Sequence, residues 1–179
     1  APLLLVLPGS RRSEVLRLLP VFGATVTALV QQHPALRVVV PTVSAVAGHV
    51  QSAVAGGPGQ PIVLAPQTQT QTQTQTQAAQ ALHSGHSDKR AAFAAADVAL
   101  AASGTVSLEL AAAATPMVIA YDMAWLSRQI IGRMLRVDTV TLVNLVSETR
   151  VVPEFIGANC RPDKIVPALA ALLSHPEDQ

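Results

Sequence analysis

The sequence predicts an α/β fold with a doubly wound parallel sheet, and three observations lead to it. Short apolar runs alternate with longer amphipathic segments, which indicates parallel β-α-β units with right-handed crossovers. Half of the 179 residues are hydrophobic, and only 13% are charged. Aromatic residues make up 3%, so Ala, Val and Leu must form the core, which favours helices packed closely on a sheet. Together these features predict one Rossmann-like domain over residues 1–179.

Five apolar runs are predicted to be strands, because each is short and bounded by turn residues. They cover residues 3–7, 36–40, 61–65, 97–101 and 117–121. The first is continuously apolar, as expected for a strand buried on both faces, and Pro8 and Gly9 end it. Pro41 closes the second strand, and a Gly-Gly-Pro-Gly turn precedes the third. The chain opens with Ala1 and enters a strand at once, which predicts a chain cut at a domain boundary.

Apolar residues recur at helical spacing between these runs. The predicted helices cover residues 11–32, 43–54, 87–95, 105–114, 124–136 and 162–174. Pro20 is expected to kink or divide the first helix. Residues 137–152 are expected to be irregular, with a short strand near Val140. The strict Gln-Thr alternation of residues 67–77 has no apolar face at either period and is expected to form a disordered surface loop.

Composition excludes several classes of function. The formal charge is +1, so no strong field gathers nucleic acid, and no nucleic-acid partner is expected. The single Cys160 excludes an intramolecular disulfide and a thiolate metal cluster. His83 and His86 are three residues apart, but nothing near them completes a metal site. We expect neither a metal nor a cofactor, and no Ser-His-Asp order or carboxylate pair indicates a hydrolase.

The segment from Ala102 to Glu109 is the most informative part of the sequence. A predicted strand runs into Ser103-Gly104-Thr105, and a helix then begins. Backbone N–H groups at a helix start lack partners within the helix, and with the positive end of the dipole they bind phosphate. Glu109 shares a helix face with Thr105, and its carboxylate can accept hydrogen bonds from the vicinal hydroxyls of a ribose. The segment therefore predicts a nucleotide-sugar pocket.

Three polar turns follow predicted strands and are expected to converge on one crevice, because such sheets bind ligands beyond their strand carboxyl ends. The turns are Gly9-Ser10, Ser103-Gly104-Thr105 and Tyr121-Asp122. Ser10 and Arg11 are expected to contact a diphosphate through the helix N-terminus and the guanidinium. The alternative for this pair is a helix cap with a solvated arginine. For Glu109 the alternative is an exposed acid that interacts with the helix dipole.

The predicted helix at 124–136 suggests a contact with a membrane surface. Its polar half carries Trp125, Arg128, Arg133 and Arg136, opposite an apolar half. A Trp among arginines is typical of a helix that lies at a lipid surface. The alternative is an ordinary amphipathic helix docked on the sheet, with Trp125 at its rim.

Four motifs, in this order and spacing, resemble the C-terminal half of the lipid-A-disaccharide synthase family. They are Leu7-Pro8-Gly9-Ser10-Arg11 with Glu14-Val15; Ala96-Asp97 with Ala102-Ser103-Gly104-Thr105 and Leu108-Glu109; Pro116-Met117-Val118 with Tyr121; and Leu142-Val143-Asn144 with Val151-Val152-Pro153-Glu154. The resemblance runs from Leu3 to the last helix, apart from the Gln-Thr tract. It implies the C-terminal domain of an inverting GT-B glycosyltransferase.

The resemblance also implies an activity. The family transfers a sugar from UDP-2,3-diacylglucosamine to 2,3-diacylglucosamine 1-phosphate, at the cytoplasmic face of the inner membrane and without a metal in the transfer step. Its C-terminal domain holds the nucleotide, and its catalytic acidic residue belongs to an N-terminal domain that is absent here. The implied UDP-binding residues are Gly9, Ser10, Arg11, Ser103, Gly104, Thr105, Glu109, Tyr121 and Asn144. Arg11 and Asn144 are also the candidates for a catalytic role; the alternative for Asn144 is a turn residue.

The sequence departs from the family pattern at a few positions. Asp122 stands where the family has a basic residue, Val143 where it has proline, and Thr149-Arg150 where it has Gly-Arg. Two other functions remain as alternatives: a GT-B enzyme for another UDP-sugar, such as an epimerase or N-acetylglucosaminyl transferase, or a non-catalytic nucleotide- or membrane-binding module. Alone, the chain is expected to bind nucleotide weakly and to turn over nothing.

Overall fold

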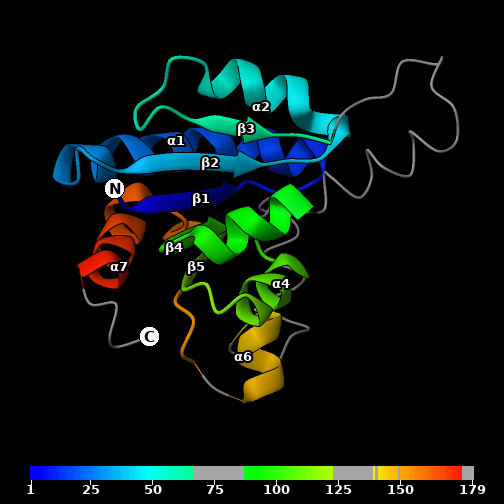
Figure 1. Cartoon of the computed structure of the whole chain (residues 1–179). Coiled ribbons are helices and arrows are strands. Elements are labelled where there is room, and N and C mark those ends of the chain that lie inside the picture. Colours follow the sequence, from blue (N-terminus) through cyan, green and yellow to red (C-terminus); the bar gives the residue numbers. More distant parts are fainter. Residues whose placement is uncertain (67–86, 123–138, 140, 149, 175–179) are drawn as a thin grey trace, which may run out of the picture.

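The computed structural model describes residues 1–66, 87–122, 139, 141–148 and 150–174. Within them, six parallel strands form one sheet, and helices pack on both of its faces (Figure 1). The predicted α/β class with a doubly wound parallel sheet is confirmed. The predictions for residues 67–77 and 124–136 and for Val140 lie outside the described residues.

The order of the strands creates a switch point beside the first strand. The strands are β1 (Leu3–Leu7), β2 (Arg37–Pro41), β3 (Ile62–Leu64), β4 (Val98–Ala101), β5 (Met117–Tyr121) and β6 (Glu154–Ile156). They lie in the order β3-β2-β1-β4-β5-β6. Leu5 pairs with Val39 on one side and with Ala99 on the other. The chain therefore extends the sheet first in one direction and then in the other, and ligands of such sheets bind where the direction changes.

Helices cover the sheet in two layers. They are α1 (Arg12–Gln32), α2 (Ala47–Val54), a helix over residues 87–95, α4 (Val106–Ala112), α6 (Leu142–Ser147) and α7 (Pro162–Ser174). Side chains of α1, α2 and α7 share one core cluster with Leu4 and Val6 of β1. Side chains of the 87–95 helix, α4 and α6 pack with Leu5 and Leu7 in a second cluster. Successive side chains of β1 thus enter opposite cores, as the two-residue period of a strand requires.

Helix α1 is continuous, so the prediction that Pro20 divides it is wrong in that respect. Pro20 lies on the exposed side of α1, where the backbone carbonyl that it leaves without a partner can reach water. In the described part of the chain, α1 alone has the length and apolar composition to cross a membrane. Core helices of globular domains pass the same test, and Val15, Leu18 and Phe22 of α1 are buried in the first cluster.

The region after β5 differs from the sequence prediction. Residues 142–147 were expected to be irregular, yet they form α6, and no strand was expected where β6 lies. Both elements are short: α6 has 6 residues and β6 has 3. Neither shows a periodic apolar pattern, and contacts made by the rest of the fold stabilise them. The other predicted strands and helices in the described residues are present, with bounds shifted by four residues or fewer.

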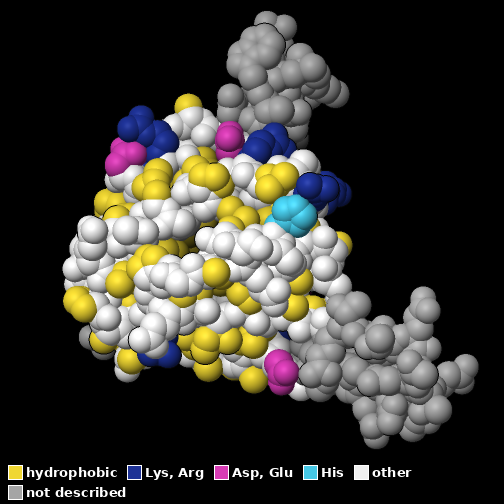
Figure 2. Space-filling view, turned by 90° about the horizontal axis from the view of Figure 1, so that it is seen from above, with side chains coloured by type: hydrophobic (Ala, Val, Ile, Leu, Met, Phe, Trp, Pro, Cys, Tyr) yellow, Lys and Arg dark blue, Asp and Glu magenta, His cyan; other side chains and the backbone are white. Residues whose placement is uncertain are grey.

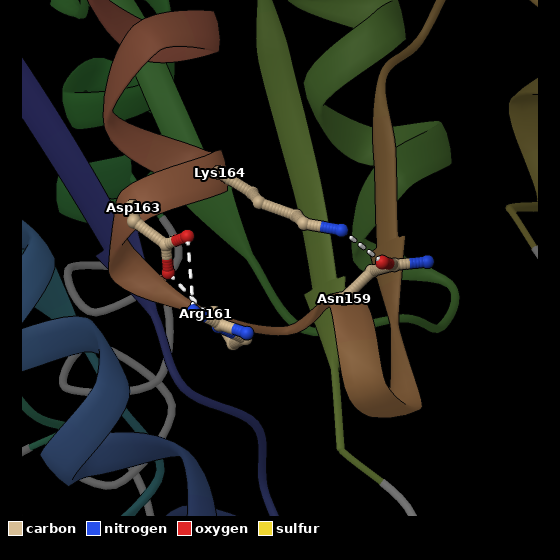
Figure 3. A network of polar contacts seen from close by, with 4 residues as sticks. All are labelled: Asn159, Arg161, Asp163 and Lys164. Atoms are coloured by element: carbon tan, nitrogen blue, oxygen red, sulfur yellow. Dashed lines mark hydrogen bonds and ion pairs between the residues drawn. The ribbon is translucent and has the colours of Figure 1, made fainter.

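Side-chain contacts hold the turn between β6 and α7 (Figure 3). Arg161 Nε and Nη2 donate to the two carboxylate oxygens of Asp163, at 3.0 and 3.2 Å. Lys164 Nζ donates to Asn159 Oδ1 at 2.5 Å. Because the Arg161 and Asp163 side chains are mostly exposed, their ion pair adds little to the stability of the fold.

The face above α2 carries few charges. Figure 2 shows mainly hydrophobic and uncharged atoms there, with most of the charged side chains near the rim. Helix α2 contains no acidic residue, lysine or arginine, and Ile62 of the edge strand β3 is 51% exposed. This face therefore offers little charge to an ionic ligand.

Candidate functional site

A cavity of about 480 Å³ lies at the carboxyl ends of β1 to β4, beside the switch point of the sheet. One wall is apolar and comes from the ends of β2 and β3, with Pro41, Val43 and Val63 among its residues. The opposite wall comes from the turns after β1 and β4 and from the 87–95 helix. Of the predicted site residues, the cavity brings together Gly9, Ser10, Ser103, Gly104, Thr105 and Glu109.

The turn after β1 is closed by a carboxylate of the chain itself. Gly9 has a φ of +108°, and a Cβ at this position would collide with the carboxylate of Glu14. The Glu14 Oε2 atom accepts a hydrogen bond from the Ser10 N–H at 3.1 Å. The start of α1 is therefore not the bare anion site that the sequence suggested for Ser10, because Glu14 already binds its amide. Arg11 is exposed as the N-cap residue and does not line the cavity.

The turn after β4 is open toward the cavity. Gly104 has a φ of +146°, and a Cβ there would have nothing within 4 Å. The backbone conformation, rather than lack of space, is thus what favours glycine. Thr105 is the N-cap residue of α4, and its side chain makes no capping hydrogen bond. The Ser107 hydroxyl turns inward and donates to the Gly104 carbonyl at 2.9 Å.

Glu109 lines the same cavity and makes an ion pair. Its Oε2 atom lies 2.6 Å from Lys89 Nζ, and the two side chains are 50% and 37% exposed. Lys89 and Asp88 come from the start of the 87–95 helix and also line the cavity. The cavity lining therefore carries three carboxylates, Glu14, Asp88 and Glu109, and one ammonium.

A comparison with models of protein families shows which family the chain belongs to. Residues 60–179 match the family model described as lipid-A-disaccharide synthetase. The chain belongs to the lipid-A-disaccharide synthetase family. This is the family that the four motifs resembled, a family of bacterial glycosyltransferases of lipid A biosynthesis.

Curated relatives match almost the whole chain. The lipid-A-disaccharide synthase of Ruegeria pomeroyi is 56% identical over 179 residues, which are 100% of this chain and 42% of that protein. The synthase of Rhodospirillum centenum is 45% identical over 176 residues, 98% of this chain and 39% of that protein. The chain thus spans about two fifths of the length of these relatives.

Two solved structures have a fold similar to that of this chain. The ADP-heptose LPS heptosyltransferase II of E. coli aligns with a TM-score of 0.65 at 14% identity, over 98% of this chain and 47% of that chain. A UDP-GlcNAc 2-epimerase from Neisseria meningitidis, bound to UDP-GlcNAc, aligns with a TM-score of 0.58 at 14% identity, over 99% and 38%. At this identity the likeness concerns the fold alone, and it agrees with the C-terminal domain of a GT-B protein.

The third and fourth family motifs lie away from the cavity lining. Tyr121 is partly buried and packs on the first core cluster, and Asp122 follows it. Asn144 is 1% exposed, and both ends of its amide are used within the protein. Its Nδ2 donates to the Val152 carbonyl and to Glu154 Oε1, each at 2.9 Å, and its Oδ1 accepts from the Val152 N–H at 3.0 Å.

The Glu154 carboxylate is the common acceptor in this polar network. Its Oε1 atom also accepts hydrogen bonds from the Thr141 N–H, at 3.1 Å, and from the Thr139 hydroxyl. The structure thus places Asn144 in contacts that fix α6 and β6, and does not bring it together with Gly9, Ser103 or Glu109. Arg150, near α6, is exposed.

Sequence reasoning missed two parts of the cavity. Thr42 and Val43 follow β2, and residues 63–66 form the end of β3 and the turn after it, so the rule that pointed to the turns after β1 and β4 could have found them. The contact of Lys89 with Glu109 had no sequence signal, because it joins separate helices. Among the described residues, no group of three His, Cys, Asp or Glu side chains could hold a metal ion. His83, His86 and the membrane candidates Trp125, Arg128, Arg133 and Arg136 lie outside those residues.

Proposed function

We propose that this chain is the donor-binding domain of a lipid-A-disaccharide synthase. It binds UDP-2,3-diacylglucosamine for transfer of the sugar to 2,3-diacylglucosamine 1-phosphate, with release of UDP. The observation that carries the proposal is the single cavity that joins the turns after β1 and β4 to Glu109. Family membership favours this reaction over that of another UDP-sugar enzyme.

The diphosphate binds at Ser103-Gly104-Thr105 in this proposal. The turn is open, its backbone amides are at a helix start that the Thr105 side chain does not cap, and its three residues line the cavity. Ser10 lines the same cavity, but its own amide is bound by Glu14, so the β4 turn supplies the main contacts. Arg11 stands beside Ser10, and contact between its guanidinium and a phosphate remains a prediction.

The nucleoside occupies the remainder of the cavity. Glu109 accepts hydrogen bonds from the ribose hydroxyls, and the apolar wall of Pro41, Val43 and Val63 packs against the flat base. Thr42 also lines this part, and its buried hydroxyl has no hydrogen-bond partner among the described residues. A polar group of the base can satisfy that hydroxyl, since buried polar atoms are seldom left unpaired. Roles for Tyr121 and Asn144 in UDP binding stay predictions that need contacts beyond this cavity.

The chain would assist the transfer mainly by electrostatics. Negative charge develops on the departing UDP as the glycosidic bond breaks. Fixed N–H donors at the β4 turn, together with Arg11, stabilise that charge more in the transition state than in the ground state. The group that takes the proton from the acceptor hydroxyl would come from the N-terminal domain of the same enzyme.

The substrates also suggest a location. Because both are lipids, we propose a peripheral protein at a membrane surface, and the family resemblance implies the cytoplasmic face of the inner membrane. Trp125, Arg128, Arg133 and Arg136 are the residues proposed to touch the membrane surface.

Titration of the 179-residue chain with UDP, followed by calorimetry, tests the proposal. We expect weak binding that Glu109→Gln reduces about tenfold or more, because a charged acceptor is lost. Glu148→Gln is the matched control, since it removes an exposed acid outside the cavity lining. Equal effects of the two substitutions would contradict the assigned site.

A second measurement separates this function from a membrane-binding module. If the chain binds lipid vesicles but no UDP, the module is the better explanation. Fusion to the N-terminal domain of a relative, with an assay for disaccharide formation, then tests the complete reaction.

A further inference from the structure

The contact between Lys89 and Glu109 joins two elements that the chain keeps apart. Lys89 belongs to the 87–95 helix and Glu109 to α4, and the 2.6 Å contact between them lies in the wall of the cavity. The pair is too exposed to contribute much to the stability of the fold. Its position in the cavity wall points instead to a role in ligand binding.

Lys89 is held in place independently of Glu109. Its Nζ lies 5.2 Å from the centre of the Phe93 ring, one helical turn later. Phe93 is 3% exposed and belongs to the second core cluster. The Thr115 hydroxyl, just before β5, donates to the Phe93 carbonyl at 2.7 Å. The ammonium therefore rests on a helix that is anchored to the core.

The contact uses only one oxygen of the Glu109 carboxylate. Lys89 binds Oε2, and among the described residues no other group donates to either oxygen. A carboxylate fixed through one oxygen presents the other in a defined direction. Lys89 is also the one cation in the described cavity lining, which contains three carboxylates, those of Glu14, Asp88 and Glu109.

We propose that Lys89 is a positioning residue, which orients Glu109 so that Oε1 accepts hydrogen bonds from the ribose hydroxyls of the bound nucleotide. This inference rests on the proposed function and adds to it the residue that sets the preference for a ribose. A flexible glutamate would lose conformational entropy on binding, whereas a glutamate already fixed by Lys89 loses less.

The test compares UDP with its 2′,3′-dideoxy analogue, which lacks the hydroxyls, by calorimetry on the 179-residue chain. We expect the original chain to bind UDP about tenfold more tightly than the analogue, the usual effect of hydrogen bonds to a charged acceptor. Lys89→Met should reduce that ratio about threefold or more. Lys89→Arg, which keeps the cation, should retain most of it.

Arg90→Met is the matched control, because it removes a neighbouring exposed cation outside the cavity lining and should leave the ratio unchanged. Lys89→Gln gives a second neutral variant, and circular dichroism verifies that each variant is folded.

If Lys89→Met weakens the binding of UDP and of the analogue equally, Lys89 acts on the diphosphate or on the cavity charge, and the positioning role is wrong. If Lys89→Met changes neither affinity, the ratio of the two affinities is also unchanged, and the positioning role is again wrong. Failure of the original chain to bind UDP overturns the proposed function itself, and the positioning role with it.

Discussion

Gly9 and Glu14 show how a single residue shapes the turn after β1. The positive φ of Gly9 and the Glu14 carboxylate packed against its α-carbon leave no place for a side chain. Glu14 in return binds the Ser10 amide and so stabilises the start of α1. The negative charge at this helix start is therefore the Glu14 carboxylate of the protein itself. It would repel a phosphate that approached the same amides.

Replacement of Gly9 tests this arrangement. Gly9→Ala should lower the free energy of unfolding by about 1–3 kcal/mol, because it combines a strained φ with displacement of Glu14. The measurement is a urea titration followed by circular dichroism. Gly23→Ala is the control: Gly23 lies within α1 with nothing within 4 Å of an added Cβ, so stability should rise by up to about 1 kcal/mol. A loss of stability at Gly23 equal to that at Gly9 would contradict this interpretation.

Residue types following strand ends were enough to predict part of the cavity. Ser103, Gly104 and Thr105 were found because small polar residues between a strand and a helix have a physical use. Lys89 was not predicted, because its place in the site depends on its contact with Glu109, 20 positions later, and on how two helices pack. The burial of Asn144 could not be predicted either, since an asparagine in a short polar segment resembles a turn residue.

At the scale of elements, a polar network stabilises α6 and β6 where apolar periodicity is lacking. Asn144 of α6 bridges to Val152 and to Glu154, the first residue of β6. Helix α6 has only 6 residues, too few to be stable by itself in water. The amide of Asn144, together with the Thr141 N–H, therefore joins this helix to the edge of the sheet.

Asn144→Ala should detach this part of the fold. We expect a loss of about 2–4 kcal/mol in the free energy of unfolding, because the Val152 N–H and carbonyl lose their partner and Glu154 Oε1 loses one of its donors. Amide hydrogen exchange at Val152 should become faster, since its N–H donates to Asn144 Oδ1. Val146→Ala, on the same helix but 75% exposed, should change stability by less than about 0.5 kcal/mol. Unchanged exchange at Val152 in Asn144→Ala would show that the network does not hold the segment.

Length explains which elements could be predicted. The 21-residue α1 and the 13-residue α7 repeat their apolar stripe over several turns, and β1 and β5 were predicted with the bounds that the structure shows. Helix α6 and strand β6 are too short to display a period. Their positions follow from tertiary contacts, which a single sequence does not display.

At the scale of the whole molecule, Cys160 links stability to pH. The thiol is buried in the first core cluster, and burial raises its pKa from 9.0 to about 11, with the negative charge of Asp122 adding to the shift. The folded protein thus favours the neutral thiol. In the unfolded chain the thiol ionises near pH 9, so its contribution to stability is full below that pH and is lost as the pH rises toward 11.

The free energy of unfolding should therefore fall by about 2 kcal/mol between pH 9 and 11 through this one group. Urea titrations at several pH values measure it. Cys160→Ala removes the thiol, so its stability should depend less steeply on pH over the same interval. Parallel curves for the two proteins would show that the pKa of Cys160 is not shifted.

The central place of β1 in the sheet has a consequence for how the chain assembles. Leu3 N–H donates to Asp97 Oδ2 at 2.7 Å, a contact between residues 94 positions apart, and β1 pairs with β4 directly after it. During synthesis the first strand can join β2 early, yet its other edge stays uncovered until β4 is made, about 90 residues after β1 ends. Until then that edge is open to any strand it meets, so a nascent chain halted before β4 is the species most exposed to wrong pairing.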